Sequence, residues 1–513
     1  MRIPVTINPN TIKTYYNEEN KKVKKRVLQS NDLTEWDKNI PKNLQEICLE
    51  AIAQNWEANP VLDEITLTID RCLLLNILST NLPLKLTVPK ISDDIYWKRC
   101  YLDRWPKLLP QDVHLDFQMS EIVKVHSNNS RKSSDVGNSN SKSRASSKSR
   151  HSSVVQQNSN ERTWKGCFLE THIREYLEKL KPECYDAVEI KELSDLCGAY
   201  VKILNIRELQ CSENSPSRIP LNAILTGLET LTELSLCFKQ TYIGEKFTWD
   251  ILKVTLQDIK LLSKGLEKCK LKVFRLRNSD IDDEKTIILL KSLLKHEDLQ
   301  ILDFSHCQIS DDGAVALSKF SLQNTMTDLI LANNEIGVKG AKALCYAICN
   351  NSCNLRAINL KLNPIMEKGG DLLMRALMMG ARNIKSLFLS GCRLGKNNTS
   401  IGEMIEHNTS LEHLDLSNNA IGEETGKFIL QGLRYNTTLK KLDVRMCKLN
   451  PANEFEILHK INQNGKNQRS SKIIRKPISV ESQFNFEISD ELLTEIENVF
   501  VPDTANITVA PQE

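Results

Sequence analysis

Three cysteines, Cys345, Cys349 and Cys353, have a spacing suited to metal chemistry, since each lies four residues from the next. Residues four apart share one face of a helix, and thiolates gathered on one face are typical zinc ligands. No histidine accompanies them, and Cys353 falls in the loop after the expected helix. Cysteine is also among the most often buried residue types. We therefore interpret the three as packing residues and expect no metal and no cofactor.

The sequence contains none of the short motifs that mark common enzyme classes. It has no Gly-rich phosphate loop, no nucleophile elbow and no His-Glu-x-x-His pair. We therefore expect a non-enzymatic protein without a small-molecule substrate. The chemistry that remains to be found is that of a surface that binds other proteins.

A leucine-rich pattern determines which elements would carry such a surface. Copies of Leu-x-x-Leu-x-Leu-x-x-(Asn/Cys)-x-Leu begin at Val201, Leu231, Leu271, Leu299, Met326, Leu355, Ile384, Leu411 and Leu439. The last six steps are 28, 27, 29, 29, 27 and 28 residues, whereas the step from Leu231 is about 40 and predicts an extra loop near 239–255. A sustained period of this length is typical of a repeat solenoid.

The spacing inside each copy predicts the fold class: an α/β, ribonuclease-inhibitor-like leucine-rich-repeat solenoid of about nine repeats. Alternating leucines give a short strand with one inward face, and helical spacing follows each strand. Strands should form a concave parallel sheet, and helices the convex side. The residue that turns the chain after each strand should be buried and should satisfy backbone groups. In chain order these residues are Ser279, Cys307, Asn334, Asn363, Cys392, Asn419 and Cys447.

Strand residues that point away from the inward leucines form a candidate partner-binding face. Its predicted members are Arg275, Arg277, Asp303, His306, Asn333, Lys361, Phe388, Asp415, Asp443 and Arg445. Both signs of charge occur, so we expect a mixed-charge trough. Phe388 is expected to be an exposed anchor within it, because aromatic residues are enriched at interfaces.

The ends of a solenoid need covers. We expect a helical cap over 162–200, repeats over 201–449 and a cap helix over 450–465. The cap helix should use Phe455, Ile457, Leu458 and Ile461. Residues 466–513 are expected to be a polar tail.

Composition divides the first third of the chain. We expect a polar basic segment over 1–39, a helical domain of three short helices over 40–125, and a disordered basic linker rich in Ser and Asn over 126–161. The first helix of the domain should bury one apolar face. That face is expected to hold Leu44, Ile47, Cys48, Ala51 and Ile52.

Overall composition limits the function classes. There are 68 Lys and Arg against 65 Asp and Glu, a net charge of only +3, which argues against a nucleic-acid-binding protein. No apolar run has the length of a membrane helix, and no signal-peptide pattern opens the chain. We therefore expect neither nucleic acid nor a membrane as a partner. The 15 cysteines, scattered and odd in number, predict free thiols in the cytoplasm.

Two aromatic blocks give the chain a more specific resemblance. The first is Asn81-Leu-Pro-Leu84, Tyr96-Trp-Lys-Arg-Cys100 and Arg104-Trp-Pro106; the second is Trp164-Lys-x-x-Phe168 followed by Glu170, His172 and Leu177. Together with the repeats they resemble the T-complex-associated testis-expressed protein 1 family, the leucine-rich-repeat subunit (subunit 5) of the nexin–dynein regulatory complex. The resemblance covers about residues 20–125 and 162–465. Its signature residues are Trp97, Cys100, Arg104, Trp105 and Trp164. The 126–161 tract interrupts a place where the family runs almost directly from one block to the next.

The resemblance implies a non-enzymatic scaffold of the axoneme of cilia and flagella. In that family's complex, neighbouring outer doublet microtubules are linked and dynein-driven beating, including sperm motility, is regulated. The implied partners are the other subunits of the complex and, indirectly, the doublet microtubules. The implied location is the cytoskeleton.

Two other functions fit the residues. An F-box-like substrate receptor of a cullin ubiquitin ligase joins three helices to leucine-rich repeats, and Ile40-Pro41-x-x-Leu44 loosely echoes the start of an F-box. An inhibitor or GTPase regulator is the other alternative, since the same fold carries several functions.

Overall fold

The computed structural model describes residues 42–108, 162–212, 215–240, 249, 253–379, 381–396, 398–466 and 489–500. The predicted basic segment 1–39, the predicted linker 126–161 and most of the predicted tail lie outside the described residues. The chain divides into two compact units, Met1–Leu86 and Thr87–Glu513.

The first unit holds the helices α3 (Leu44–Gln54) and α4 (Thr68–Ile77). The side chain of Asn43 caps α3 by accepting a hydrogen bond from the backbone N–H of Glu46 at 2.7 Å. The predicted buried face of α3 is wrong, because Leu44 is 76% and Ile47 is 50% exposed. The helix instead turns Leu49 inward, and the large indole of Trp56, beyond the end of the helix, is fully buried.

The second unit begins at Thr87, which lies inside the predicted helical domain of 40–125. A helix with no counterpart in the prediction, α5 (Leu84–Lys90), spans the division between the units, so the domain has four helices rather than three. The last of them, α6 (Asp94–Arg104), belongs to the second unit and packs on α9 (Trp164–Lys179). The predicted 40–125 domain is therefore not one body. The physical reason is that aromatic side chains of α6 are buried against those of α9.

Nine parallel strands form one sheet in chain order, which confirms the predicted solenoid. They are β1 Ile203–Ile206, β2 Glu233–Leu236, β3 Val273–Leu276, β4 Ile301–Asp303, β5 Asp328–Ile330, β6 Ala357–Asn359, β7 Ser386–Phe388, β8 His413–Asp415 and β9 Lys441–Asp443. Every strand begins two residues after a predicted repeat start. The inward leucine-type residues stay in register, from Leu204 in β1 to Leu442 in β9, and all are buried.

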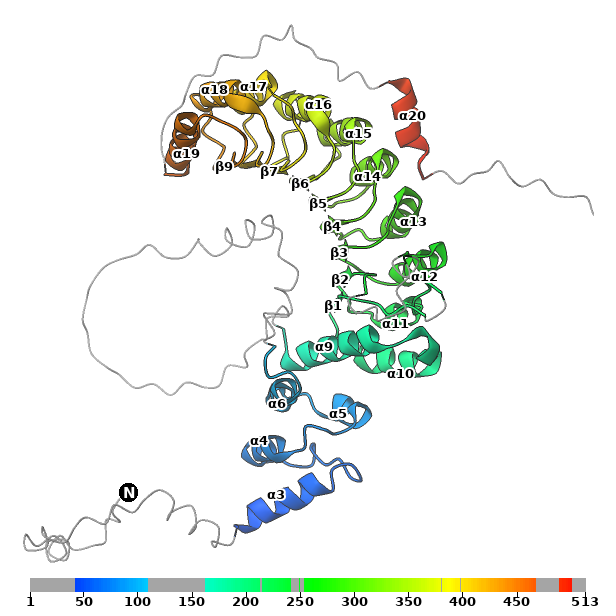
Figure 1. Ribbon diagram of the computed structural model, residues 1–513. Coiled ribbons are helices and arrows are strands. Elements are labelled where there is room, and N and C mark those ends of the chain that lie inside the picture. The colour runs from blue at the N-terminus through cyan, green and yellow to red at the C-terminus, as the bar shows by residue number, and fades with distance from the viewer. Residues whose placement is uncertain are drawn as a thin grey trace, which may run out of the picture. The chain divides into compact units, whose positions relative to one another are not determined.

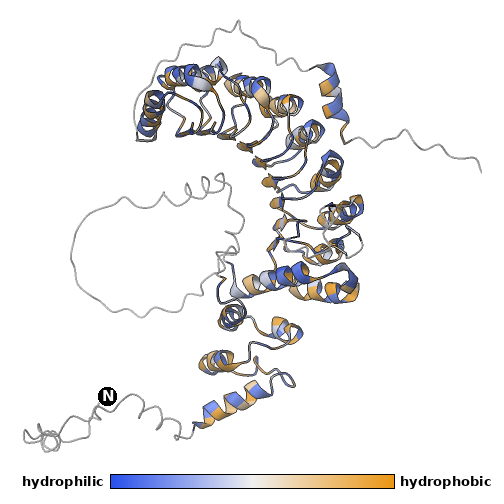
Figure 2. Cartoon of the chain, viewed as in Figure 1, coloured by the Kyte–Doolittle hydropathy of each residue, from blue (hydrophilic) through white to orange (hydrophobic). Residues whose placement is uncertain are grey.

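Helices follow the strands on the convex side (Figure 1). They are α11 Asn222–Gly227, α12 Leu256–Leu266, α13 Asp283–Leu293, α14 Asp311–Gln323, α15 Val338–Cys349, α16 Met366–Met379, α17 Thr399–His407, α18 Gly422–Leu433 and α19 Pro451–Lys466, and α10 Ala187–Cys197 precedes β1. A short 3-10 turn, Pro182–Cys184, precedes α10. Figure 2 shows that these helices combine apolar and polar residues, as expected of helices buried on one side only.

The residues predicted to turn the chain after each strand are buried and bonded to the backbone, as predicted. Asn419 donates to the carbonyls of Leu389 at 2.7 Å and Leu416 at 2.8 Å. Cys447 fills the same position with a thiol that donates to the Leu416 carbonyl at 3.1 Å. These bonds link consecutive repeats, so the side chains that turn the chain also hold the stack together.

The first strand has an edge that the cap helix α9 covers. Glu170 accepts hydrogen bonds from the backbone N–H groups of Lys202 (3.1 Å) and Ile203 (2.9 Å), and Glu178 accepts from that of Arg207 (2.8 Å). An uncovered edge strand invites pairing with another chain. Carboxylates from α9 therefore replace the missing strand.

The other end of the array is covered by α19. Of the four residues predicted to form this cap, two are buried and two are exposed. Ile457 and Ile461 are buried, but Phe455 is 73% and Leu458 is 45% exposed. The side of α19 that meets α18 and β9 is buried, and no further repeat packs on its other side among the described residues. The predicted polar tail is also corrected, since α20 (Asp490–Asn498) is an amphipathic helix with buried Leu492 and Ile496.

Deleting 126–161 should leave the fold intact. The backbone N–H of Trp164 donates to Asp94 Oδ1 at 2.9 Å, so the elements on either side of the tract meet directly. We expect an unchanged melting temperature and soluble expression. Insoluble protein from the deletion would contradict the interpretation of the tract as a linker.

Candidate functional site: the concave sheet face and its carboxyl edge

The third position of each strand forms one row across the concave face. In register from β3 to β9 the row contains Arg275, Asp303, Ile330, Asn359, Phe388, Asp415 and Asp443. Five of the ten predicted face residues lie in it. The sheet therefore brings together side chains that are 27 to 29 residues apart in the repeats, one strand spacing from each other.

The acidic and amide side chains of this row accept hydrogen bonds from nearby backbone N–H groups. Asp303 Oδ1 accepts from the N–H of Ser305 at 3.0 Å, and Asp415 Oδ1 accepts from that of Ser417 at 2.9 Å. Asn359 Oδ1 accepts from the N–H of Lys361 at 3.1 Å in the same way. Such bonds to the residue two positions on are typical of Asx turns. Each of these turns ends its strand.

The charges in the first half of the face are paired across neighbouring strands. Arg277 Nε donates to Asp303 Oδ2 at 2.7 Å, and Asp303 is completely buried. Arg275 lies 3.5 Å from Glu233 Oε2, and burial lowers the pKa of Arg275. Both signs of charge occur on this half of the face, and they neutralise each other.

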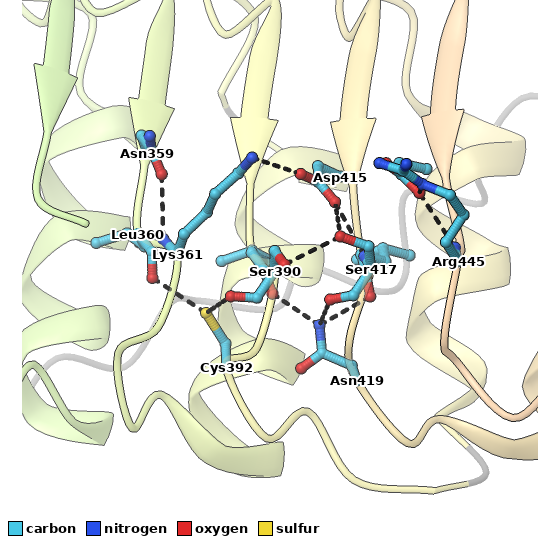
Figure 3. A network of polar contacts seen from close by, with 12 residues as sticks. Asn359, Leu360, Lys361, Ser390, Cys392, Asp415, Ser417, Asn419 and Arg445 are labelled. Atoms are coloured by element: carbon cyan, nitrogen blue, oxygen red, sulfur yellow. Dashed lines mark hydrogen bonds and ion pairs between the residues drawn. The ribbon is translucent and has the colours of Figure 1, made fainter. Parts of the chain in front are cut away.

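Phe388 is not the exposed anchor that we predicted. Its side chain is 5% exposed and packs with Ile330 and Ala357 of the two preceding strands. The ammonium group of Lys361 lies 5.1 Å above its ring and continues to Asp415 Oδ2 at 2.8 Å. One long side chain thus covers the aromatic ring and reaches two strands along the sheet, as Figure 3 shows for the ion pair.

The last repeats extend this polar network. The hydroxyl of Ser417 donates to Asp415 Oδ1 at 2.7 Å, and its oxygen lies 2.9 Å from the hydroxyl of Ser390 (Figure 3). Just after β9, Arg445 Nε donates to Asp443 Oδ1 at 2.9 Å, and hydrogen bonding by Arg445 lowers the pKa of Asp443. Arg445 itself is exposed, with 78% of its side chain in solvent.

Five predicted face residues lie beyond the ends of their strands, which corrects their predicted position: Arg277, His306, Asn333, Lys361 and Arg445. Of these, His306 and Asn333 occupy the bend after the strand with φ values of 58° and 55°, and their side chains are joined by a contact of 3.0 Å between Asn333 Nδ2 and His306 Nδ1. The same left-handed position recurs from repeat to repeat. Its members are Asn278, His306, Asn333, Leu362, Gly391, Asn418 and Met446. We call this set the carboxyl ridge, because it follows the carboxyl ends of the strands.

Two ridge residues missed by the sequence prediction are Leu362 and Met446. Their φ values are 60° and 59°, and they are 49% and 80% exposed. Asn and Gly tolerate this conformation, whereas it costs side chains such as leucine and methionine about 1 kcal/mol or more. Exposed apolar side chains on strained backbone are candidate contacts for another protein. The sequence could have revealed these two residues by their position. They immediately precede Asn363 and Cys447, where other repeats have Asn, His or Gly.

Comparison with known proteins agrees with this architecture. A family model described as "Leucine Rich repeat" matches residues 295–318, 323–345, 407–429 and 435–452. This match agrees with the leucine-rich-repeat solenoid that the nine parallel strands form.

The chain is also similar to several individual proteins that share one name. The chain is 28% identical over 341 residues to dynein regulatory complex subunit 5 of Macaca fascicularis, covering 62% of this chain and 58% of the relative. For the Mus musculus protein of the same name the identity is 29% over 308 residues, covering 56% and 52%. For that of Chlamydomonas reinhardtii it is 24% over 251 residues, covering 48% and 50%. The chain thus spans about half the length of these relatives, and they confirm the predicted family resemblance.

The signature residues of this leucine-rich-repeat protein form the joint between α6 and α9. Trp97 is fully buried, donates from Nε1 to the Ile91 carbonyl at 2.9 Å, and its ring lies 5.3 Å from that of Phe168. Trp105 lies 5.3 Å from the same phenyl ring, and Trp164 lies 5.8 Å from the ring of Tyr101. These residues act in packing, which attaches α6 to the cap of the array.

Two other signature residues complete the joint. Arg104 Nη1 lies 3.0 Å from His172 Nδ1, and its Nη2 donates to Glu175 at 3.0 Å. Cys100 is buried on the same helix, and burial raises the pKa of its thiol.

Acid should weaken this joint through His172. Burial, helped by the adjacent Arg104 charge, lowers the pKa of His172 to about 4, while an unfolded histidine titrates near about 6.5. The unfolded chain therefore binds a proton that the folded chain does not, so stability falls as the pH drops from about 6.5 to about 4. We expect a loss of ~1–2 kcal/mol in the free energy of unfolding, after allowance for solvent screening.

Urea unfolding at pH 7 and pH 4.5 measures this loss, and His172→Gln should make it smaller. Equal losses in the two proteins would contradict the assignment to His172.

The three spaced cysteines are packing residues in the leucine-rich-repeat protein. Burial raises the pKa of each thiol, and Cys349 donates to the Ala376 carbonyl at 3.8 Å. In the described part of the chain, no group of three or more His, Cys, Asp or Glu side chains is placed to hold a metal ion. Among those same residues, no helix is both long and apolar enough to cross a membrane.

Proposed function

We propose that this chain is a non-enzymatic subunit of the axonemal nexin–dynein regulatory complex. It acts there as a scaffold that helps to link outer doublets and to regulate dynein-driven motility of cilia and flagella. The observation that carries the proposal is the similarity to three proteins named dynein regulatory complex subunit 5. The partners are then other subunits of the complex, and the location is the axoneme.

The physical properties of the array support this role. Its inward residues form one continuous core through nine strands, so each repeat supports its neighbours and the surface is stiff. The charges of the concave row are neutralised within the chain, which leaves the carboxyl ridge as the part of that face with exposed apolar groups. We infer that Leu362 and Met446 contact another subunit, and that the row beneath them fixes their positions.

The function is tested by purifying the tagged full chain from ciliated cells and identifying the proteins that accompany it. Other regulatory-complex subunits are the expected result. A cullin and its F-box adaptor would instead show a ubiquitin-ligase receptor, and a single nuclease or small GTPase would show a regulator.

The ridge is tested in the same experiment with the double variant Leu362→Asp/Met446→Asp. Charges placed at an apolar contact lose the burial and leave unpaired carboxylates, so recovery of the contacting subunit should fall at least tenfold. Leu458→Asp, which changes a similarly exposed leucine of α19, is the matched control and should recover the subunit normally. Equal recovery with the double variant would exclude the ridge as the contact.

A further inference from the structure

The C-terminal helix α20 lies on the outside of the array, against α14 and α15 (Figure 1). Leu492 and Ile496, four residues apart on one face of α20, are 5% and 3% exposed. They pack with Val315 of α14 and Ala343 of α15, and Tyr346 and Val499 border the contact. The small side chain of Ala343 leaves room between the two repeat helices for these larger residues.

We call the surface of α14 and α15 that α20 covers, around Val315 and Ala343, the groove, and two lysines beside it fix the direction of α20. Lys339 at the start of α15 lies 2.8 Å from Glu495, and it also lies 3.0 Å from Asp312 of α14. Lys319 of α14 donates to the carbonyl of Glu497 near the end of α20, and its ammonium lies 5.6 Å above the ring of Phe500. A cation at the carboxyl end of a helix is favourable because the helix dipole is negative there. The groove is therefore matched to an acidic amphipathic helix.

The array is complete without α20. The strands β5 and β6 that precede α15 and α16 pair directly, and their inward residues Leu329 and Ile358 are fully buried. A helix of nine residues is also too short to be stable by itself in water. Only 23 residues separate Lys466 from Asp490, so α20 stays covalently close to the array.

We propose that the groove between α14 and α15 is a docking site for an acidic amphipathic helix of a partner protein, and that α20 occupies it within the chain as a reversible latch. The partner helix carries an apolar pair four residues apart and acidic residues beside it, as α20 does. Because α20 buries only two full side chains, a longer helix with the same pattern displaces it. This site is separate from the carboxyl ridge and does not depend on the proposed function.

The test uses full-length chains and a fluorescein-labelled synthetic peptide with the sequence of residues 488–502, whose binding is followed by fluorescence anisotropy. The wild-type chain should bind the peptide weakly, because α20 competes. Ile496→Asp releases α20 and should tighten binding at least tenfold. Thr494→Asp introduces the same carboxylate at an exposed position of α20 and should bind as the wild type does.

A charge exchange shows whether the peptide occupies this groove. Adding Lys339→Glu to the Ile496→Asp chain should weaken peptide binding at least threefold, and a peptide with Glu495→Lys should recover it. Equal binding by the wild-type and Ile496→Asp chains would overturn the latch. Failure of the peptide to bind either chain, or indifference to Lys339→Glu, would overturn the docking site.

Discussion

Replacing Leu416 by aspartate should unfold the repeat array. Leu416 is fully buried after β8, and its carbonyl accepts the bonds from Asn419 and Cys447 that join two repeats. A carboxylate at this position has no partner in the apolar core, and burying it costs several kcal/mol. Since a folded domain is stable by only about 5–15 kcal/mol, we expect the loss of cooperative unfolding around β8 and β9. Thermal melting followed by circular dichroism measures it.

Leu362→Asp is the matched control for this variant. It makes the same chemical change at a leucine that is 49% exposed and has a φ of 60°. Aspartate tolerates this conformation better than leucine, so the melting temperature should not fall. A Leu416→Asp protein that melts like the wild type would show that the repeat register is wrong.

Replacing Trp97 by alanine should separate α6 from the cap of the array. The change removes a fully buried indole, its contact with Phe168 and its bond to the Ile91 carbonyl. Large-to-small changes of buried tryptophan cost ~3–5 kcal/mol. We expect a lower melting temperature and faster proteolysis within 94–104, while the repeats themselves remain folded.

Trp249→Ala provides the comparison, since that indole is 76% exposed. Its stability and its rate of proteolysis should match those of the wild type. If Trp97→Ala behaved in the same way, the joint between α6 and α9 would not depend on the tryptophan.

Some features of this protein follow from the sequence alone because they repeat locally. The leucine spacing specified nine strands and their starts, and Asn363, Asn419, Cys392 and Cys447 were recognisable as the residues that turn the chain. In a solenoid each repeat meets only its neighbours, so a period in sequence translates directly into a period in space. The aromatic blocks around Trp97 and Trp164 likewise pointed to the family, although their contact with each other was not evident.

The tertiary structure alone decided which of these residues are accessible. Phe388 is buried because Lys361 crosses it to reach Asp415, and Asp303 is buried because Arg277 and Ser305 enclose it. The position of α20 depends on Val315 and Ala343, which lie far from it along the chain. Exposure of a side chain depends on the size and charge of neighbours from other repeats. Periodicity places a residue on a face, but only the packed neighbours determine whether that residue remains at the surface.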